Sequence, residues 1–350
     1  MSLETRRLLF IIAGAAFLIL SPLILLYTSG YRMSRDFKIT KTGGIYISAP
    51  KSGSEIFLDN KLKKKTNILQ SGFFIQNLTP KTYSVLVGKE GYWPWQKNLE
   101  VKEQFVTEAA AFLVKRDPEG RIILKGAFID MFASPYEKIL MFTEKTSSQS
   151  SLKKISFYLP EKDEFLVKNS LETQKALSFY GSISEMSWAR DEVIFKTEGG
   201  VVNAKFDLNN KNVDAFYLAP KDVSGLELDD PYAKVKKQIR IWRDLRNTIW
   251  ADWLDNDNEP PYYLCGADKC VFPKQVFVSR FPVKNIDFFP YRRDVVIAAI
   301  RNGVFAIELD DRGGKLLQPI YKGKEPNFAV FQNEEKVYVL DEENLLEIGL

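Results

Sequence analysis

The chain has 350 residues, of which 45% are apolar and 13% aromatic, so it can bury a core across roughly two or three domains of average size. Its 49 basic and 45 acidic residues leave a net charge of only +4, which argues against a nucleic-acid binder. The absence of histidine excludes Ser-His-Asp and Cys-His nucleophile systems, HExxH zinc sites and imidazole catalysis. With only two cysteines, a usual zinc site would lack ligands. We expect no metal, no cofactor and no catalytic residue.

An uncharged run of residues from Leu8 to Tyr27 follows Arg6 and Arg7. At about 1.5 Å per helical residue, this run is about as long as the hydrocarbon core of a bilayer is thick. It predicts a transmembrane helix over 8–28, preceded by a cytoplasmic tail at 1–7. A cleaved signal peptide is the alternative, although its apolar region is normally shorter and is followed by a small-x-small cleavage site.

The side of the membrane on which the remaining chain lies is indicated by the cysteines. Arg6 and Arg7 favour a cytoplasmic N-terminus, the basic linker at 29–42 opposes it, and long following domains translocate largely regardless of charge. Cys265 and Cys270 are spaced so that a tight hairpin can close a disulfide, and such bonds persist in oxidising compartments. Two unpaired thiols in a cytosolic domain are the alternative. We expect a single-pass protein of the cytoplasmic membrane with its bulk on the extracytoplasmic side.

Residues 43–115 alternate apolar and polar positions in short runs that turn residues separate. The runs lie at 45–48, 55–58, 73–78, 83–87, 97–101 and 109–114. Six or seven short strands without helical periodicity predict a small antiparallel β-sandwich.

The same segment resembles a known family. The pattern G-x-I-x-I-S-x-P-x-x-G-S-x-I-F-L-D-N ends at Asn60, N-L-T-P-K-T-Y-S-V-L-V begins at Asn77, and K-E-G-Y-W-P-W begins at Lys89. Together they resemble a PEGA domain, although residues 50–54 replace the tetrad that names the family. The resemblance covers about a fifth of the chain and implies a small β-sandwich of surface-exposed, membrane-anchored bacterial and archaeal proteins, generally regarded as non-catalytic. The whole chain is also similar to uncharacterised envelope proteins of candidate-phylum bacteria, which implies no activity.

Residues 116–350 carry a repeat of apolar strand, polar turn and apolar strand. The copies start at Ile129, Ile183, Ile286 and, in degenerate form, Phe328. The wide gap between the second and third copies leaves room for one further unit at 238–278. Periods of roughly 40 to 50 residues are typical of a β-propeller, and the turns at 134–137 and 188–191 resemble those of TolB-like and WD-repeat blades. We therefore expect a mainly β protein: transmembrane helix, PEGA-like sandwich at 43–115 and propeller of about five blades at 116–350.

Two aromatic stretches supply candidate binding residues. Trp93 and Trp95 would share one face of an extended strand, where they can stack on sugar rings or on a partner; packing between the sandwich and its neighbour is the alternative. Trp250 and Trp253 belong to the densest aromatic stretch, which either forms a ligand surface or fills a blade core. These four tryptophans are the predicted binding residues.

Two charged stretches also have structural explanations that require no ligand. Lys61–Lys65 could attract an anionic wall polymer or lipid headgroups, but a solvated hairpin tip also explains it. The segment 255–259 offers oxygen ligands of the kind that calcium prefers. Because Pro260 stands where an EF-hand loop needs its turn glycine, we expect a polar loop between strands there.

Two function classes remain. The expected function is that of a non-enzymatic binding or scaffold protein, anchored in the lipid bilayer through residues 8–28, which contacts an envelope protein or a cell-surface polymer. The alternative is a carboxylate-dependent propeller hydrolase or lyase that acts on an envelope polysaccharide. Such an enzyme should show buried carboxylates with raised pKa values in the central channel.

Overall fold

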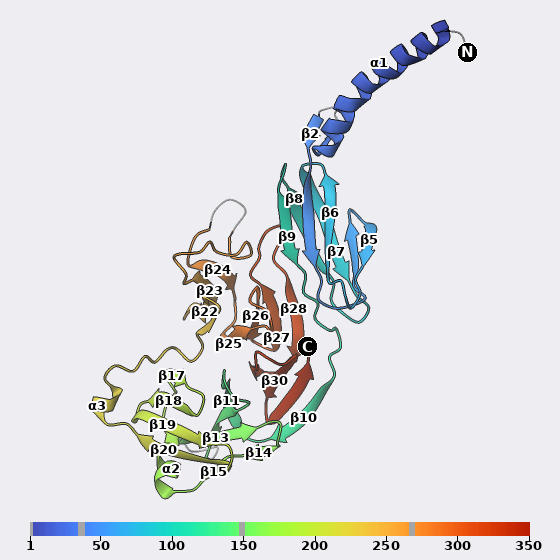
Figure 1. Cartoon of the computed structure of the whole chain (residues 1–350). Coiled ribbons are helices and arrows are strands. Elements are labelled where there is room, and N and C mark those ends of the chain that lie inside the picture. Colours follow the sequence, from blue (N-terminus) through green and yellow to red (C-terminus); the bar gives the residue numbers. More distant parts are fainter. Residues whose placement is uncertain (1–2, 34–38, 147–150, 266–269) are drawn as a thin grey trace. The chain divides into compact units, whose positions relative to one another are not determined.

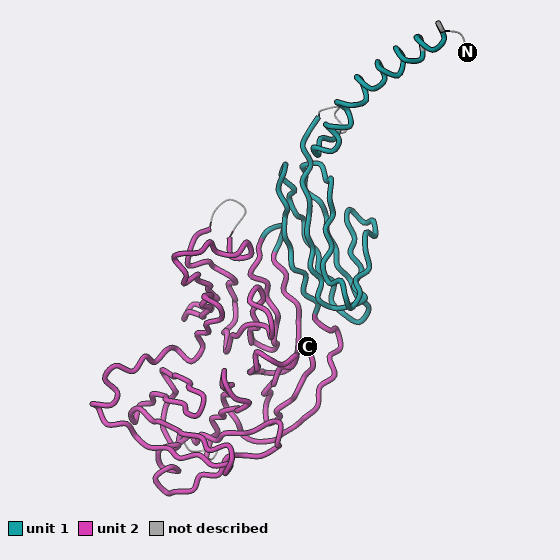
Figure 2. The backbone as a smooth tube through the Cα atoms, in the orientation of Figure 1, with its two compact units in different colours: residues 1–113, 312–314 teal, residues 114–311, 315–350 magenta. Residues whose placement is uncertain are grey.

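The computed structural model describes residues 3–33, 39–146, 151–265 and 270–350. It is mainly β with one apolar helix near the N-terminus (Figure 1). The chain divides into two compact units, which are described separately (Figure 2). Unit 1 comprises residues 1–113 and 312–314, and unit 2 comprises residues 114–311 and 315–350.

The apolar run of the sequence forms helix α1, Leu3–Thr28. It is long and apolar enough to cross a membrane, although a signal sequence would have the same properties. Pro22 lies inside the helix without ending it, as is tolerated in membrane-spanning helices. Among the described residues, its membrane-length window has no buried residues.

The Arg32 side chain joins the end of α1 to the sheets of unit 1. Strands β1 (Tyr31–Met33) and β2 (Ile39–Lys41) form an antiparallel hairpin after the helix. The Arg32 Nη1 donates to the carbonyl oxygens of Tyr27, at 2.7 Å, and of Tyr31, at 2.8 Å, while Nη2 donates to Asn77 Oδ1 at 3.1 Å. The guanidinium thereby satisfies a carbonyl in the last helical turn, where intrahelical donors run out.

Two small sheets make up the rest of unit 1, with strand orders β6-β3-β9 and β5-β4-β7-β8. Their strands are β3 Gly43–Ser48, β4 Glu55–Leu58, β5 Lys61–Lys65, β6 Gly72–Leu78, β7 Lys81–Gly88, β8 Trp95–Val101 and β9 Val106–Ala110. Burial alternates strictly along β8, so one face of this strand is buried and the other exposed.

Two details of unit 1 differ from the sequence expectation. Strand β9 pairs with β3 in parallel, with Ile45 opposite Thr107, because the chain returns to the first sheet only after crossing the second. The predicted strand at 109–114 lies instead at Val106–Ala110, and residues 111–114 are buried without joining a sheet. A run of apolar residues in the sequence indicates that a segment is buried, but whether it forms a strand depends on a pairing partner elsewhere in the chain.

The described part of unit 2 forms five sheets of four or five strands each. The first has β11 Phe128–Ala133, β12 Leu140–Lys145, β13 Lys153–Leu159, β14 Glu164–Phe165 and β16 Ser178–Phe179. The second has β17 Glu185–Trp188, β18 Glu192–Thr197, β19 Gly200–Asp207, β20 Asn212–Tyr217 and the parallel strand β15 Val167–Lys168. Two short helices, α2 Leu171–Ala176 and α3 Pro220–Val223, lie in connections of this half.

Three further sheets complete unit 2. The third has β21 Lys234–Lys236, β22 Ile239–Arg243, β23 Thr248–Trp253 and β24 Lys274–Val278. The fourth has β25 Val283–Phe288, β26 Val295–Ile300, β27 Gly303–Glu308 and β28 Leu317–Lys322. The fifth has β29 Asn327–Ala329, β30 Lys336–Asp341, β31 Asn344–Gly349 and β10 Gly120–Lys125.

The fifth sheet is closed by the first strand of the unit. Strand β10 pairs antiparallel with β31, with Gly120 opposite Ile348, so the two ends of the unit share one sheet. Successive antiparallel meanders that are closed in this way give unit 2 a propeller-like arrangement. The repeat copies lie on or beside the first two strands of four sheets, and the additional unit at 238–278 lies on β22 to β24.

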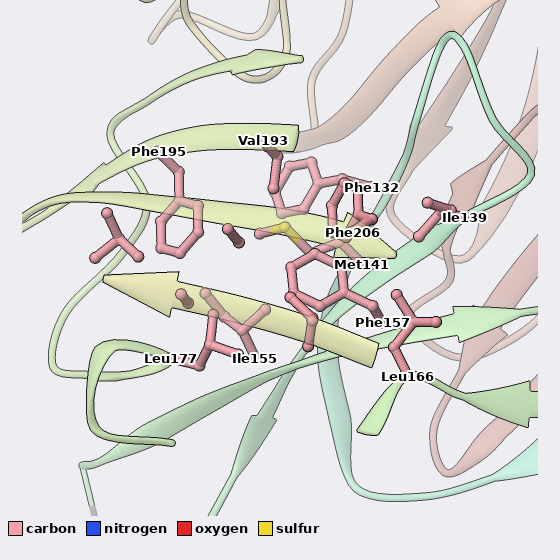
Figure 3. Packing of buried hydrophobic residues seen from close by; sticks show 14 of the residues in the cluster. Phe132, Ile139, Met141, Ile155, Phe157, Leu166, Leu177, Val193, Phe195 and Phe206 are labelled. Carbon is pink, nitrogen blue, oxygen red and sulfur yellow. The ribbon is translucent and has the colours of Figure 1, made fainter. Parts of the chain in front are cut away.

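Neighbouring sheets of unit 2 pack through apolar clusters. Between the first and second sheets, Phe132 and Met141 share a buried cluster with Val193 and Phe206 (Figure 3). The Phe157 ring meets the Phe206 ring edge-on at a centroid distance of 4.9 Å. Similar clusters join the third sheet to the fourth and the first to the fifth. Each sheet is therefore held by contacts between faces rather than by shared backbone pairing.

Candidate functional site

A cavity of about 780 Å³ lies in unit 2. The edge strands of three sheets contribute to it: β11 supplies Asp130, β25 supplies Lys284 and β29 supplies Asn327. Arg243, at the end of β22, and Tyr232, just before β21, complete this part of the lining. Residues from separate sheets therefore converge on one concave site, as is usual for small-ligand pockets.

Asp130 is the partly buried carboxyl group of this cavity. Its Oδ1 accepts a hydrogen bond from Asn327 Nδ2 at 3.2 Å, and its backbone N–H donates to Thr143 Oγ1 at 3.2 Å. Burial raises the pKa of Asp130 above its ordinary value, although Lys153, Lys284 and other nearby groups partly oppose this effect. The carboxyl group therefore stays protonated to a higher pH than an exposed aspartate.

Arg243 is one of the partly buried cations of the lining. Its guanidinium carbon is 4.2 Å from the centroid of the Tyr232 ring, a cation–π distance. Its Nε is buried and has no hydrogen-bond partner among the described residues. A buried donor without an acceptor is costly, but this atom has almost no accessible surface, so it does not itself face the cavity.

The rim of the cavity carries ion pairs. Lys284 Nζ donates to the carbonyl oxygen of Glu325 at 2.8 Å and to Glu325 Oε2 at 3.2 Å. Lys324 Nζ donates to Glu342 Oε1 at 2.5 Å. With Lys145, four basic side chains line the cavity against three acidic ones, and two of the acids are paired at the rim. The lining therefore carries one more basic side chain than acidic ones.

A second, partly buried polar network lies outside the cavity lining. Gln332 Nε2 donates to Asp287 Oδ1 at 2.9 Å, and Lys236 Nζ donates to Gln332 Oε1 at 2.6 Å and to the Arg292 carbonyl oxygen at 2.7 Å. Burial raises the pKa of Asp287 to about 6 and lowers the pKa of Lys236 to about 8. Because these groups satisfy one another, the network is suited to joining β21 to β25 rather than to binding a ligand.

The two tryptophans predicted to share a face in unit 1, Trp93 and Trp95, differ in burial. Trp95 is fully buried, with 0% of its surface exposed, whereas Trp93 is 36% exposed. Strand β8 begins at Trp95, and its alternation places Trp95 on the same buried face as Leu99. Trp95 is therefore buried and presents no surface on which a ligand could stack.

The tryptophans of the third sheet lie on two faces. Trp250 is paired across strands with Trp242; their rings are stacked at 6.5 Å, and Trp250 Nε1 donates to Asp244 Oδ2 at 3.0 Å. Trp253 packs against the core shared with the fourth sheet, and its Nε1 donates to the Asn258 carbonyl oxygen at 3.1 Å. Neither Trp250 nor Trp253 lines the cavity.

The remaining candidates are explained by local structure. Lys61–Lys65 is strand β5 rather than a hairpin tip. Asp255 Oδ1 accepts from the backbone N–H groups of Asp257 and Asn258, at 2.9 and 3.2 Å, which makes a compact polar turn. In the part of the chain that the structure describes, no group of three or more acidic or cysteine side chains is placed to hold a metal ion. Cys265 and Cys270 form the predicted disulfide.

The cavity residues are absent from the sequence-based set of candidates. Asp130, Arg243, Lys284 and Asn327 lie on four sheets, so no local spacing connects them. One signal was present: Asp130 and Asp287 follow the isoleucines that begin two copies of the repeat, and both become edge-strand carboxyl groups with raised pKa values.

No protein-family model matches this chain, and no curated protein matches it. Several solved structures resemble it. Hsv2 of Kluyveromyces lactis is 11% identical, with 73% of this chain and 67% of that chain covered and a TM-score of 0.25. A luciferin-regenerating enzyme is 9% identical, with 67% of this chain and 96% of that chain covered and a TM-score of 0.35. The beta-propeller domain of Myceliophteria thermophila Cps50 (Swd1) is 9% identical over 76% and 79%, with a TM-score of 0.28. At these low scores, none of them assigns a function to this chain.

Proposed function

We propose that this chain is a membrane-anchored, non-enzymatic binding protein of the cell envelope, whose ligand occupies the cavity of unit 2. The observation that carries the proposal is the 780 Å³ cavity, whose lining brings together Asp130, Arg243 and Lys284 from three sheets. A concave site with a few convergent polar groups is the usual form of a ligand pocket. The ligand belongs to an envelope protein or a cell-surface polymer.

In this proposal α1 crosses the cytoplasmic membrane and the chain from residue 29 onward lies on the extracytoplasmic side. The length and apolar character of α1 support the anchor. The bond between Cys265 and Cys270 supports an oxidising compartment, since structural disulfides rarely persist in a reducing cytosol. Both features belong to one chain, so they favour the same topology.

The proposed architecture is a PEGA-like sandwich in unit 1 and a five-bladed propeller in unit 2. The two small sheets of unit 1 and the motif resemblance support the first assignment. The five sheets of the described residues, the closure by β10 and the positions of the repeat copies support the second. Resemblance to a family regarded as non-catalytic also favours a binding role.

Co-sedimentation with cell-envelope fragments tests the proposal. We expect the detergent-solubilised full chain to sediment with the fragments and the Arg243→Gln variant to stay largely in the supernatant. Arg240→Gln is the matched control, because Arg240 lies on the same strand, is 42% exposed at its side chain and is not part of the lining. If both variants sediment equally, the cavity is not the binding site.

A second candidate function is favoured by Asp130 alone. A carboxyl group with a raised pKa inside a cavity is what a general acid requires, so a hydrolase or lyase remains the alternative. Glycoside hydrolysis normally requires a second carboxylate beside the first. The other acids of the lining, Glu325 and Glu342, are occupied by ion pairs with Lys284 and Lys324, which favours binding over turnover.

A further inference from the structure

Basic side chains from three strands face Asp130. Lys153 lies on β13, Arg243 at the end of β22 and Lys284 on β25, and all three stabilise the ionised form of this carboxyl group. Lys153 also donates to the Gly181 carbonyl oxygen at 2.5 Å, which fixes its ammonium group near the cavity. Even so, the desolvation of Asp130 outweighs these three cations. The Asp130 carboxyl group therefore offsets the positive charge of these three side chains only in part.

Arg243 lines the cavity and is held in place by neighbouring residues. Strand pairing with Ile249 fixes its backbone, and the Tyr232 ring at 4.2 Å supports the plane of its guanidinium. Its buried Nε lacks an acceptor among the described residues. The Arg243 side chain also hydrogen-bonds the Tyr232 side chain. A planar guanidinium matches carboxylate and phosphate oxygens better than it matches neutral hydroxyl groups.

We propose that the cavity of unit 2 binds an acidic polymer segment, with a carboxylate or phosphate oxygen on Arg243 and additional positive charge from Lys284 and Lys145. This inference rests on the proposed function, because it assigns the ligand class of the same cavity. Two of the four basic side chains of the lining are paired with acids, Lys284 with Glu325 and Lys324 with Glu342, so Arg243 and Lys145 supply the positive charge that these pairs do not offset.

The titration of Asp130 determines how the affinity of the site for an anion changes with pH. The groups that face it are Lys153, Arg243, Lys284 and the Tyr232 hydroxyl, whose own pKa is raised by burial. While Asp130 is protonated, the positive charge of its neighbours is available to the anion. Once it ionises, it competes with the ligand for the same cations. Affinity for an acidic polymer should therefore fall as the pH rises through the raised pKa of Asp130.

Equilibrium binding to the full chain in nanodiscs tests the inference. The probes are polygalacturonate for a carboxylate ligand, polyphosphate for a phosphate ligand, and dextran as the neutral control. Arg243→Gln should lower the affinity for the acidic probe by about tenfold or more, since hydrogen bonds between charged groups are strong. Arg243→Lys should lose less, and Arg240→Gln should leave binding unchanged. Asp130→Asn, which keeps an oxygen for Asn327, should tighten binding and remove its pH dependence.

Opposite effects of Arg243→Gln and Asp130→Asn are the decisive result, because loss of folding would weaken both variants. Dextran binding equal to that of the acidic probes, or equal affinity of the Arg243→Gln and Arg240→Gln variants, would overturn the inference. Preference between the two acidic probes distinguishes carboxylate from phosphate. If Arg243→Gln abolishes sedimentation with envelope fragments while neither acidic probe binds, the inference fails and the proposed function stands.

Discussion

Asn327 donates its side-chain N–H to Asp130 across 3.2 Å and so connects strands that are 197 residues apart in the chain. Its own Oδ1 accepts the backbone N–H of Phe328 at 2.8 Å, which fixes the amide orientation. Asn327 is 4% exposed but Asp130 is only partly buried, so this bond is partly shielded from water. It joins edge strands of the first and last sheets at the wall of the cavity. The site therefore depends on closure of unit 2.

Replacement of Trp95 by alanine should destabilise the full chain strongly. The side chain is fully buried in unit 1, and loss of a buried tryptophan costs about 3 to 5 kcal/mol. Trp93→Ala removes a partly exposed ring and should cost markedly less. Chemical denaturation followed by circular dichroism measures both. Weakened envelope binding by the Trp95→Ala variant without loss of stability would restore Trp95 to the binding residues.

The stability of unit 2 should fall as the pH rises from about 4 to about 6 through the titration of Asp287. Its pKa is about 6 in the folded chain and 3.8 in the unfolded reference, so the folded state binds more protons in this window. Allowing for its partial exposure, the loss is about 2 kcal/mol. The lowered pKa of Lys236, about 8, acts at higher pH, where stability should rise again.

The Asp287→Asn variant isolates this effect. Asparagine retains the oxygen that accepts from Gln332 Nε2 and from the backbone N–H of Phe288. We expect the free energy of unfolding of this variant to vary little between pH 4 and pH 6 by comparison with the wild type. A slope as steep as that of the wild type would assign the titration to another group.

Removal of the disulfide should have a small and local effect. The ring closed by Cys265 and Cys270 is short, so the chain-entropy estimate of its contribution is about 2 kcal/mol. The Cys265→Ser/Cys270→Ser double variant should therefore unfold at a lower denaturant concentration and still bind envelope fragments. Thiol labelling of the unreduced wild-type chain from its own cells gives the complementary test, and two reactive thiols there would contradict the extracytoplasmic placement.

Membrane extraction distinguishes an anchor from a cleaved leader. With α1 as a spanning helix, the full chain should resist extraction by alkaline carbonate. Protease added outside intact spheroplasts should digest the chain from about residue 29 onward, leaving a fragment that contains Arg6 and Arg7. A soluble mature chain that starts near residue 30 would show that the apolar helix is a signal peptide.

Local patterns predicted the strands of this protein better than they predicted its site. Ile129, Ile183 and Ile286 lie in or beside the first strands of their sheets because apolar alternation is a short-range signal. The partner of β10 lies more than 200 residues away, so sequence alone did not reveal the closure. The burial of Trp95 was not predictable for a related reason: spacing gives a shared face, but packing decides which face is buried.

The cavity could not be predicted from the sequence for the same physical reason. Asp130 and Arg243 are ordinary charged residues in the sequence, and only the packing of sheets brings them to one cavity. The raised pKa of Asp130 follows from burial, which no spacing encodes. In contrast, the disulfide between Cys265 and Cys270 was predictable, because its two partners are near neighbours in the chain.

Binding without turnover is tested most directly by the fate of envelope polymer captured on the immobilised full chain. After prolonged incubation, the retained polymer is eluted, weighed and sized, with Arg240→Gln and Arg243→Gln chains treated in parallel. The wild type and Arg240→Gln should retain the polymer at its original chain length, whereas Arg243→Gln should retain little. Polymer that is shortened by the wild type but not by Asp130→Asn would contradict the binding account and establish a hydrolase or lyase.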